Sequence, residues 1–395
     1  SSSRNTRKHR IPRSPPPPAC AVPPAGNLAA AALEAAFGAA VAGLGGPLAL
    51  AVSGGGDSVA LMHLAARHAA AHGLPAPVVL TVDHGLRKGS RGDARKVAAW
   101  AKAIGLKSHV LSWLGEKPKT GVEAAARQAR YRLMGTWLAA NGVSTLCVGH
   151  TQDDQAETFL LRLARGSGVD GLAAMRALAP WPEPGFSEPG FSEPGFAQLR
   201  VVRPLLALPR ADLRAFLGTI GQAWLDDPMN HDPAFDRVRL RGAAEALAAA
   251  GLSAPRIAAA AAHLARARAA LEQVTQAVLA RAVHPAGKTR QDGLLVDAAA
   301  LGGAPREVGL RALAAVLMAV SGAPYRPRFE ALERLFDRIV AGELGGGATL
   351  MGCRVGPARR GIPKGAAGAP VLLVRPEGPR RDSRAGSRMS SKTGP

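Results

Sequence analysis

The sequence predicts an α/β fold in which a mostly parallel sheet forms the first domain and a mainly helical domain follows it. Three observations support this prediction. Between 27 and 165, short apolar runs of strand length alternate with segments of helical spacing, which is the pattern of βαβ units. The glycine-rich stretch SGGGDS at 53–58 joins the first of these runs directly to a helical pattern. After 242 the chain is rich in Ala, Leu and Arg with helical spacing.

The first domain is expected to alternate helices and strands. Since strands separated by helices form parallel sheets, ligands are expected at the carboxyl ends of the strands. In chain order we expect a helix from 27 to about 42, a strand at 48–52, a helix from 57, a strand at 78–82, a helix around 92–104, a strand at 108–111, a helix at 121–140, a strand at 145–148 and a helix from about 153 to 165.

Composition divides the rest of the chain. Residues 1–26, with four consecutive prolines, are expected to form a disordered basic arm. The pentapeptide EPGFS recurs through 183–197, and its Pro and Gly place it in a surface loop of the domain at 27–242. Residues 243–345 are expected to form the helical domain. The segment 346–395 fits either a basic tail or a reduced C-terminal β-unit.

The chain is strongly basic, with 50 Lys and Arg against 29 Asp and Glu and a net charge of +21. Residues 1–26 contribute +5 and residues 346–395 contribute +8, which leaves +8 for the body between them. A polyanionic partner explains this charge, and nucleic acid is favoured over a membrane because no amphipathic basic helix stands out. An Arg-rich and Ala-rich genome composition explains it equally well, so charge alone leaves both readings open.

The three cysteines, Cys20, Cys147 and Cys353, are far apart and form no CxxC pair. This spacing indicates a reducing compartment and argues against a disulfide framework, a zinc knuckle or an iron–sulfur site. No apolar run approaches the ~20 residues that span a bilayer, and the first residues lack the apolar core of a signal peptide. We therefore expect a cytoplasmic chain without a membrane partner.

The stretch SGGGDS has the character of an anion site. A strand that ends in a glycine-rich turn and opens a helix gathers backbone N–H groups and the positive end of the helix dipole. It is not a Walker A loop, because no Lys follows the glycines, and the only GKT, at 287–289, has Ala282 where that motif needs its first glycine. It is not a Rossmann fingerprint either, since Val59 stands where GxGxxG needs its last glycine.

Five stretches in chain order resemble the motifs of one enzyme family. SGGGDS resembles the PP-loop of the ATP pyrophosphatase superfamily, whose members cleave ATP between the α- and β-phosphates. Together with four further stretches it resembles the tRNA(Ile)-lysidine synthetase family over about 46–241. One departure is Val238, where the family usually has Asn. The four further stretches are VDHGLR at 82–87, AARQARY at 125–131, GHTQDDQAET at 149–158, which continues to Met175, and DPMNHDPAFDR at 227–237.

The resemblance implies a reaction and its partners. The family uses ATP to attach lysine to C2 of the wobble cytidine, position 34, of an isoleucine tRNA with a CAU anticodon. The reaction passes through an adenylated cytidine and releases AMP and pyrophosphate. The implied cofactors are ATP and Mg²⁺, and the implied partners are this tRNA and L-lysine. The helical segment at 243–345 is then expected to hold the tRNA, with a role in forming a homodimer as the alternative.

The resemblance also implies site residues. Glycines let the backbone close on phosphates, and a carboxylate at the helix start suits Mg²⁺ on the leaving pyrophosphate. A histidine and an arginine would supply a donor or positive charge to the developing adenylate. The implied residues are, for ATP, Ser53, Gly54, Gly55, Gly56, Asp57, Ser58 and His84; for Mg²⁺, Asp57; for catalysis, Asp57, Arg127, His150, Asp154 and Glu157; and for the substrates, Asp154, Glu157, Arg165, Arg237 and Arg241.

Asp154 and Glu157 are the most informative pair of charged residues. Because they stand three positions apart at the start of a helix, they share one face. Two carboxylates there can bind the ammonium groups of lysine and accept a proton, while Asp153 is expected to cap the helix. The alternative reading is that these acids only complement the helix dipole.

Three other functions stay open at the level of sequence. A PP-loop tRNA thiolase activates the same kind of base carbonyl but needs active-site cysteines, and Cys147 is the only cysteine near the motifs. A PP-loop ligase for small molecules needs an ammonia source, and no glutaminase domain is apparent. A non-catalytic nucleotide- or RNA-binding protein would need the fold and the charge but not the paired acids.

Overall fold

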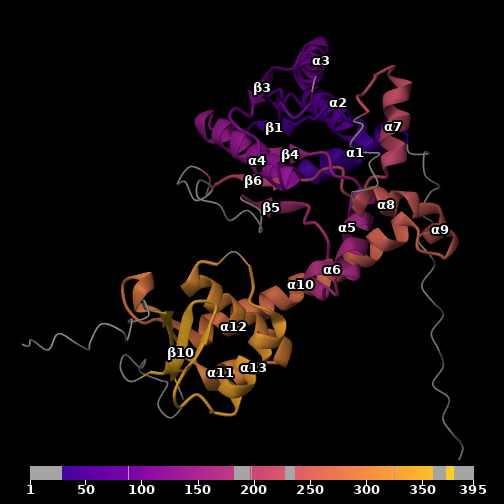
Figure 1. The fold of residues 1–395 in the computed structure, drawn as a ribbon. Helices are drawn as coiled ribbons and strands as arrows, with labels where there is room; N and C mark the ends of the chain where they lie inside the picture. Colours follow the sequence, from indigo (N-terminus) through magenta and orange to yellow (C-terminus); the bar gives the residue numbers. More distant parts are fainter. Residues whose placement is uncertain are drawn as a thin grey trace, which may run out of the picture.

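The computed structural model contains two sheets joined by a long helix (Figure 1). The first sheet has the strand order β3-β2-β1-β4-β6-β5, and the second has the order β7-β8-β11-β10-β9. The arm at 1–26, the EPGFS repeat apart from Phe196, motif residues 227–235 and the tail from 378 lie outside the described residues. The structure describes residues 29–87, 89–181, 196, 198–226, 236–323, 325–358 and 371–377.

The first sheet is parallel except for its last strand. β1 pairs in parallel with β2 and β4, β2 with β3, and β4 with β6, whereas β5 runs antiparallel to β6. The carboxyl ends of β1, β2 and β4 therefore lie side by side at one edge, where a ligand is expected. The strands are β1 (Leu48–Ala51), β2 (Val78–Asp83), β3 (Ser108–Ser112), β4 (Thr145–Val148), β5 (Leu178–Pro180) and β6 (Arg200–Val202).

Helices cover both faces of this sheet. α1, α2, α3 and α7 supply the core on one face, and α4 supplies the core on the other. The predicted α/β class with a mainly parallel sheet is confirmed, and the predicted bounds of the first nine elements shift by only a few residues. The helices are α1 (Ala30–Val41), α2 (Gly56–Ala71), α3 (Ser90–Ala103), α4 (Val122–Ala140), α5 (Gln152–Ala164), α6 (Val169–Leu172), α7 (Arg210–Thr219), α8 (Asp236–Gly242) and α9 (Ala244–Ala249).

Side chains of the central strands alternate between these two cores, because neighbouring residues of a strand point to opposite faces. Leu50 and Cys147 belong to the core under α1, α2 and α7, whereas Ala49 and Leu146 belong to the core under α4. Since both faces are buried, the strands appear in the sequence as continuous apolar runs. Their positions were predictable from composition for that reason.

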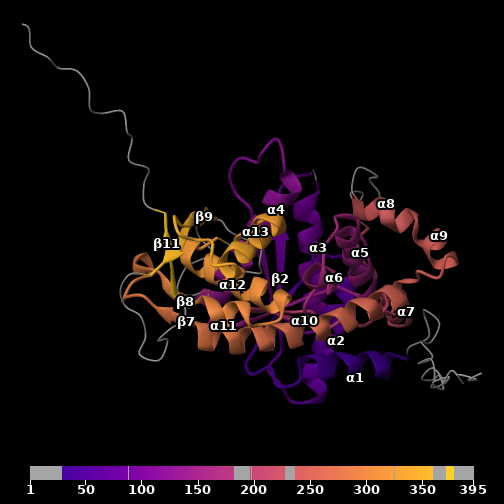
Figure 2. The same cartoon turned by 90° about the horizontal axis from the view of Figure 1, so that it is seen from below.

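α10 (Ala254–Ala282) leads from the first unit to the second and contacts both, packing against α5 and α6 at one end and α12 at the other (Figures 1 and 2). In the described part of the chain no helix, α10 included, has the length and apolarity needed to cross a bilayer. The second unit consists of β7 (Val283–Pro285), η3 (Arg290–Asp292), β8 (Leu294–Asp297), α11 (Ala298–Gly302), α12 (Arg306–Ser321), α13 (Phe329–Val340), β9 (Ala348–Leu350), β10 (Cys353–Pro357) and β11 (Val371–Pro376).

The segment at 243–345, predicted to be mainly helical, contains strands as well as helices. Two strands, β7 and β8, lie inside it, and β8 pairs with β11 from beyond 345. The described part of 346–395 therefore contributes three strands to an antiparallel sheet that packs on α12. These strands are only three to six residues long. The sequence allowed a reduced β-unit at 346–395, but it did not place these strands, because such short runs are ordered by pairing with strands far away in the chain.

Leu50→Ala should lower the free energy of unfolding by about 2–5 kcal/mol, because Leu50 is fully buried in the core of the first unit and the truncation leaves a cavity. Leu114→Ala is the matched control, since Leu114 is 83% exposed and its loss should change the free energy by no more than about 0.5 kcal/mol. Urea unfolding followed by circular dichroism measures both. Equal losses in the two variants would contradict the assigned core.

Candidate active site

The predicted phosphate loop follows β1 and turns directly into α2. Gly54 adopts a left-handed φ of +96°, a conformation that favours glycine. α2 begins at Gly56, and no described side chain caps it, so its first N–H groups are left for a ligand. The Ser58 hydroxyl donates to the Gly55 carbonyl oxygen at 2.8 Å and lies 3.3 Å from the Ser53 hydroxyl. The residues predicted to bind phosphates therefore form one compact turn.

Trp224 and Leu225 cover the outside of this turn, a contact that the sequence did not predict. The Leu225 N–H donates to the Gly54 carbonyl oxygen at 2.8 Å. A Cβ atom on Gly54 would lie only 2.5 Å from Leu225 Cδ1, and one on Gly56 would lie 3.6 Å from the Trp224 ring. Gly54 is therefore required both by its φ and by close packing. The signal was missed because these residues are far apart in the sequence.

Gly149 brings the end of β4 against the start of α2. A Cβ atom at this position would lie 3.0 Å from Ser58 Cα and 3.1 Å from the carbonyl carbon and oxygen of Asp57. Those neighbours are backbone atoms, which cannot rotate away. The absence of a side chain at Gly149 thus sets the distance between the phosphate loop and His150, the next residue.

Arg210, the first residue of α7, lies among three carboxylates. Its Nε donates to Asp57 Oδ2 at 3.0 Å, its Nη2 donates to Asp154 Oδ1 at 3.0 Å, and its Nη1 lies 3.5 Å from Glu157 Oε1. Asp57 and Asp154 come from the first turns of α2 and α5, and Glu157 comes from the next turn of α5, so one guanidinium holds the two helices together. Arg210 was not among the predicted site residues, because an Arg after a proline carries no local signal of such contacts.

The start of α5 differs in one respect from the prediction, which made Asp153 its cap. Thr151 is the N-cap, and its N–H and hydroxyl donate to Asp154 Oδ2 at 2.8 and 2.9 Å, which forms a capping box. Asp153 instead accepts the backbone N–H of Arg210 at 2.8 Å. Asp153 therefore fixes the start of α7, and with it the position of the Arg210 side chain.

Arg241, predicted to contact the RNA, pairs with Glu157. Its Nε donates to Glu157 Oε1 at 2.7 Å and its Nη2 donates to Oε2 at 3.2 Å. This two-point contact joins α8 to α5 and fixes the orientation of the carboxylate. In this structure Arg241 is thus part of the acidic cluster, defined as Asp57, Asp154 and Glu157 with Arg210 and Arg241.

Burial and the arginines act differently on two of these acids. Burial raises the pKa of Asp57, and the nearby charge of Arg210 only partly opposes it. Burial also acts to raise the pKa of Asp154, but the charge of Arg210 and the two hydrogen bonds from Thr151 outweigh it and lower the pKa. Asp57 Oδ1 is buried without a hydrogen-bond partner among the described residues. The site therefore favours the ionised form of Asp154 more than that of Asp57.

His150 follows β4 and is neutral. Burial, together with the charge of Arg203, lowers its pKa to about 3. Arg203 Nε donates to His150 Nδ1 at 3.1 Å, so the ring proton is assigned to Nε2. Of the two predicted roles, positive charge or hydrogen-bond donor, the geometry favours a donor through Nε2.

His84 follows β2, and burial lowers its pKa to about 4, with a further contribution from the charge of Arg130. His84 Nδ1 and Arg130 Nε are both buried without a hydrogen-bond partner among the described residues. His84 therefore lies at the predicted edge of the sheet, next to an arginine of α4 that the sequence analysis did not single out.

The remaining predicted residues are arginines of α4, α8 and the turn after α5. Arg127 lies over the Tyr131 ring, 5.1 Å from its centre. The charges of Arg127 and Arg237 both contribute to lowering the pKa of His150, which places all three in one neighbourhood. Arg165 points to Asp236 at the start of α8, with 3.6 Å between Nη2 and Oδ2. Arg165 is thus beside α8 rather than in the acidic cluster.

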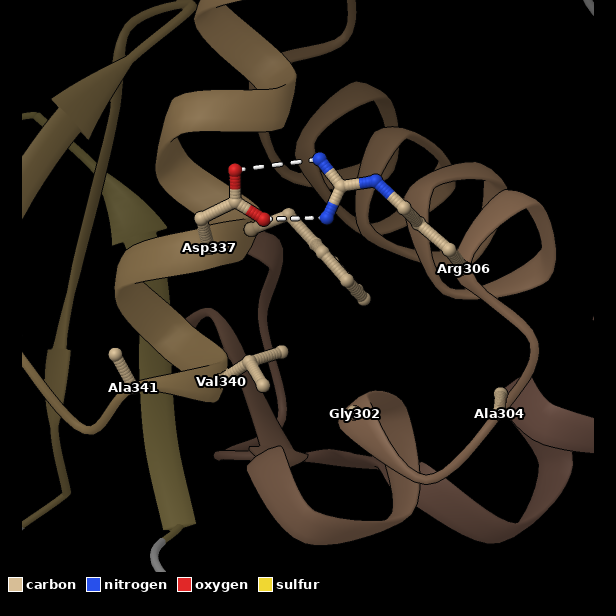
Figure 3. A pocket seen from close by; sticks show the side chains of 7 residues that line it. Gly302, Ala304, Arg306, Asp337, Val340 and Ala341 are labelled. Atoms are coloured by element: carbon tan, nitrogen blue, oxygen red, sulfur yellow. Dashed lines mark hydrogen bonds and ion pairs between the residues drawn. The ribbon is translucent and has the colours of Figure 1, made fainter.

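A pocket of about 430 Å³ lies elsewhere, in the second unit (Figure 3). Arg306 and Asp337 face each other across it and form a two-point ion pair (Figure 3). Its lining contains none of the predicted site residues and consists of Gly302, Ala304, Arg306, Phe336, Asp337, Val340 and Ala341.

The sequence of this chain is similar to those of known PP-loop proteins. The sequence profile of the PP-loop domain matches residues 42–245. A tRNA(Ile)-lysidine synthase of Bradyrhizobium sp. (strain BTAi1) is 40% identical over 78% of this chain and 84% of its own length. The enzyme of that name from Methylobacterium nodulans is 40% identical over 86% of this chain and 93% of its own. Among solved structures, the U34-tRNA thiolase NcsA from Methanococcus maripaludis is similar at a TM-score of 0.46 and 14% identity, over 61% of this chain and 78% of that one.

Gly149→Ala should raise the Kd of ATP about tenfold, because the added methyl pushes β4 away from the start of α2 and such overpacking costs about 1–3 kcal/mol. Isothermal titration calorimetry with ATP measures the change. Gly45→Ala is the control, since a Cβ atom there meets nothing within 4 Å. An unchanged Kd in Gly149→Ala would mean that this contact does not set the loop.

His150→Asn should make the stability of the protein less dependent on pH. The folded protein keeps His150 neutral down to a pKa of about 3, whereas the unfolded chain protonates it near 6.5. Between these values the unfolded chain binds more protons, so the wild-type free energy of unfolding falls as the pH falls. Urea unfolding at several pH values should give a shallower slope for His150→Asn and a wild-type slope for His263→Asn, which changes an exposed histidine of α10. Identical slopes for all three proteins would refute the buried neutral state.

Proposed function

The chain belongs to the tRNA(Ile)-lysidine synthase family, and on that premise we propose that it uses ATP to join L-lysine to C2 of the wobble cytidine of an isoleucine tRNA with a CAU anticodon. The products are lysidine at position 34, AMP and pyrophosphate. This makes the protein a carbon–nitrogen ligase that forms AMP.

The charge of the acidic cluster is the observation that supports the proposal most directly. Three carboxylates meet the two guanidinium groups of Arg210 and Arg241. Three negative charges against two positive ones leave one negative charge, which one ammonium group neutralises. Because Asp57 belongs both to the cluster and to the phosphate loop, a bound amine would lie beside the nucleotide.

The first step activates the base. The C2 carbonyl of cytosine is a poor electrophile, so its oxygen must first become part of a leaving group. That oxygen attacks the α-phosphorus of ATP, the bond to pyrophosphate breaks, and AMP stays on the oxygen. The turn at 53–58 and the start of α2 would hold the phosphates through backbone N–H groups. Ser53, Ser58 and His84 would add hydrogen-bond donors there.

Mg²⁺ fits the residues present. Asp57 Oδ2 accepts from Arg210, while Oδ1 is buried without a partner among the described residues, as expected for an oxygen that lacks its cation. A bound cation would oppose the effect of burial on the pKa of Asp57. Mg²⁺ held there would neutralise charge on the leaving pyrophosphate. The described side chains contain no cluster of three or more that could hold a metal alone, so the phosphates would supply further ligands.

His150 and Arg127 would stabilise the developing adenylate. Because the pKa of His150 is about 3, its ring stays neutral near pH 7, with the proton on Nε2. It would donate one hydrogen bond to the phosphate that is being transferred. Arg127 would supply positive charge from α4 in the same neighbourhood.

The second step joins the amine. An amine of lysine must be neutral when it attacks, and Asp154 and Glu157 would bind its ammonium form and accept the proton. The amine nitrogen then forms a bond to C2, the bond from C2 to its oxygen breaks, and AMP leaves with that oxygen. Both acids are only 7% exposed, which would keep water from the activated carbon.

Arginines at the rim would hold the RNA. Arg165 and Arg237 are exposed and adjoin the cluster through α8, and the second unit would contact the rest of the tRNA. The wobble base lies in a single-stranded loop and can be unstacked into the site. The proposal places the reaction in the cytoplasm, where tRNA, lysine and ATP meet.

Incorporation of radiolabelled lysine into a transcript of the isoleucine tRNA with a CAU anticodon, in the presence of ATP and Mg²⁺, tests the proposal. Label should enter this RNA and not the methionine tRNA with the same anticodon. AMP and pyrophosphate should be released in equal amounts with the label. Release of pyrophosphate without label would support the activation step but exclude lysine as the nucleophile.

The double variant Asp154→Asn, Glu157→Gln should incorporate lysine about 10²–10⁴-fold more slowly, because the groups that hold the amine and accept its proton are lost. ATP binding, measured by calorimetry, should change much less. Glu330→Gln removes an exposed acid of α13 and should behave as the wild type. Normal lysine transfer by the double variant would refute the role given to these acids.

A further inference from the structure

Asp170 joins the two units of the protein. It lies in α6, which follows α5 in the first unit. Its Oδ1 accepts from Arg311 Nη1 at 2.8 Å, and its Oδ2 accepts from Arg326 Nη1 at 2.5 Å. Both arginines belong to the second unit, on α12 and in the segment before α13. One carboxylate therefore holds two cations from the other half of the molecule.

The burial of Arg311 makes this contact more than a surface ion pair. Arg311 is 4% exposed, and a buried guanidinium requires partners for its charge and its N–H groups. Glu307, one turn earlier on α12, accepts from Arg311 Nε at 2.8 Å. Asp170 accepts from Nη1, so the second unit relies on a residue of the first to pair this buried charge.

Asp170 is also tied rigidly to the acidic cluster. Arg162 of α5 donates from Nη1 to the carbonyl oxygens of Gly171 and Ala174 at 2.9 and 3.0 Å. A Cβ atom on Gly171 would lie 2.4 Å from Ser167 Cβ, so the turn between α5 and α6 is closely packed. α5 is the helix that carries Asp154 and Glu157. The path from these acids to Asp170 thus runs through one helix and one tight turn.

α10 adds two contacts at the same place. Arg268 Nη1 lies 3.4 Å from the backbone carbonyl oxygen of Asp170, and Glu272 pairs with Arg176 just after α6. α10 packs against both α6 and α12 (Figure 1), and the bond from Arg311 to Asp170 joins these two helices directly. The junction therefore consists largely of charged groups arranged around Asp170.

We propose that Asp170 is a positioning residue that fixes the second unit relative to the acidic cluster, so that an RNA held by the second unit presents its target base to the catalytic residues. This rests on the proposed function. Two sites that bind one RNA raise its affinity together only when the distance between the sites matches the distance between the parts of the RNA that they bind. Loss of the fixed orientation then weakens the binding of an RNA that spans both units, while leaving the chemistry at the acidic cluster unchanged.

Kinetics with two RNA substrates test the proposal, using the full chain of Asp170→Asn. The KM for the full-length isoleucine tRNA should rise about tenfold, equivalent to ~1.4 kcal/mol of binding, with kcat near that of the wild type. An isolated anticodon stem-loop, which lacks the parts of the tRNA that the second unit is proposed to hold, should react with Asp170→Asn as fast as with the wild type. Asp170→Glu, which keeps the charge, should recover part of the lost affinity.

Asp337→Asn is the matched control. It also removes a carboxylate that pairs with an arginine, Arg306, but this pair lies within the second unit (Figure 3). It should leave both substrates unaffected. If Asp170→Asn leaves the KM for full-length tRNA within twofold of the wild type, or if it slows the stem-loop equally, the positioning role is refuted.

Hydrogen exchange tests this inference independently of the proposed function. In Asp170→Asn, amides of α6 and of α12 near Arg311 should exchange faster than in the wild type, and in Asp337→Asn they should not. Unchanged exchange would overturn the inference whatever the RNA does. Should Asp170→Asn not fold, Arg326→Gln removes one half of the contact at a side chain that is 47% exposed, and the same results are expected in weaker form. If the wild type transfers no lysine, the proposed function fails, and the exchange result still tests the contact.

Discussion

The pairing of the Arg210 guanidinium with three carboxylates is the interaction on which the site depends. Asp57, Asp154 and Glu157 come from the starts of two helices, and without a cation between them their charges would repel and their burial would be unfavourable. Arg210 itself is fixed by the bond from its backbone to Asp153. Ion pairs as well as packing therefore hold α2, α5 and α7 in their positions around the edge of the sheet.

The same edge of the sheet holds an ionised acid and a neutral histidine, because the fold gives the two side chains different surroundings. Arg210 favours the ionised form of Asp154, while His150 is kept neutral by burial and by the positive charge of Arg203. In water such groups would titrate within a few pH units of each other. In the folded protein the acid is charged and the histidine is neutral. One part of the site can therefore bind a cation, while another part donates a hydrogen bond from a neutral group to an anion. Adenylation followed by attack of an amine requires both.

The junction between the units repeats this use of charge on a larger scale. Asp170 pairs a buried arginine that its own unit satisfies only in part through Glu307. An apolar junction would hold the units together but would specify their orientation less well, because hydrogen bonds to a guanidinium are directional. A second unit in a fixed position suits a substrate as large as a tRNA, whose reacting base is a small part of what must be recognised.

The sequence by itself determined the order of the elements in the first unit, the phosphate turn at 53–58 and the acid pair on α5, because each of these features depends on residues that are close together in the chain. Tertiary structure alone decided the rest. Arg210 pairs with Asp57, Arg241 pairs with Glu157, and Leu225 packs on Gly54, and each contact joins residues separated by long stretches of sequence. The strands of the second sheet are likewise completed by distant partners. Local sequence patterns reflect secondary-structure propensity and burial. The partner of a charged side chain or of an edge strand depends instead on the tertiary fold.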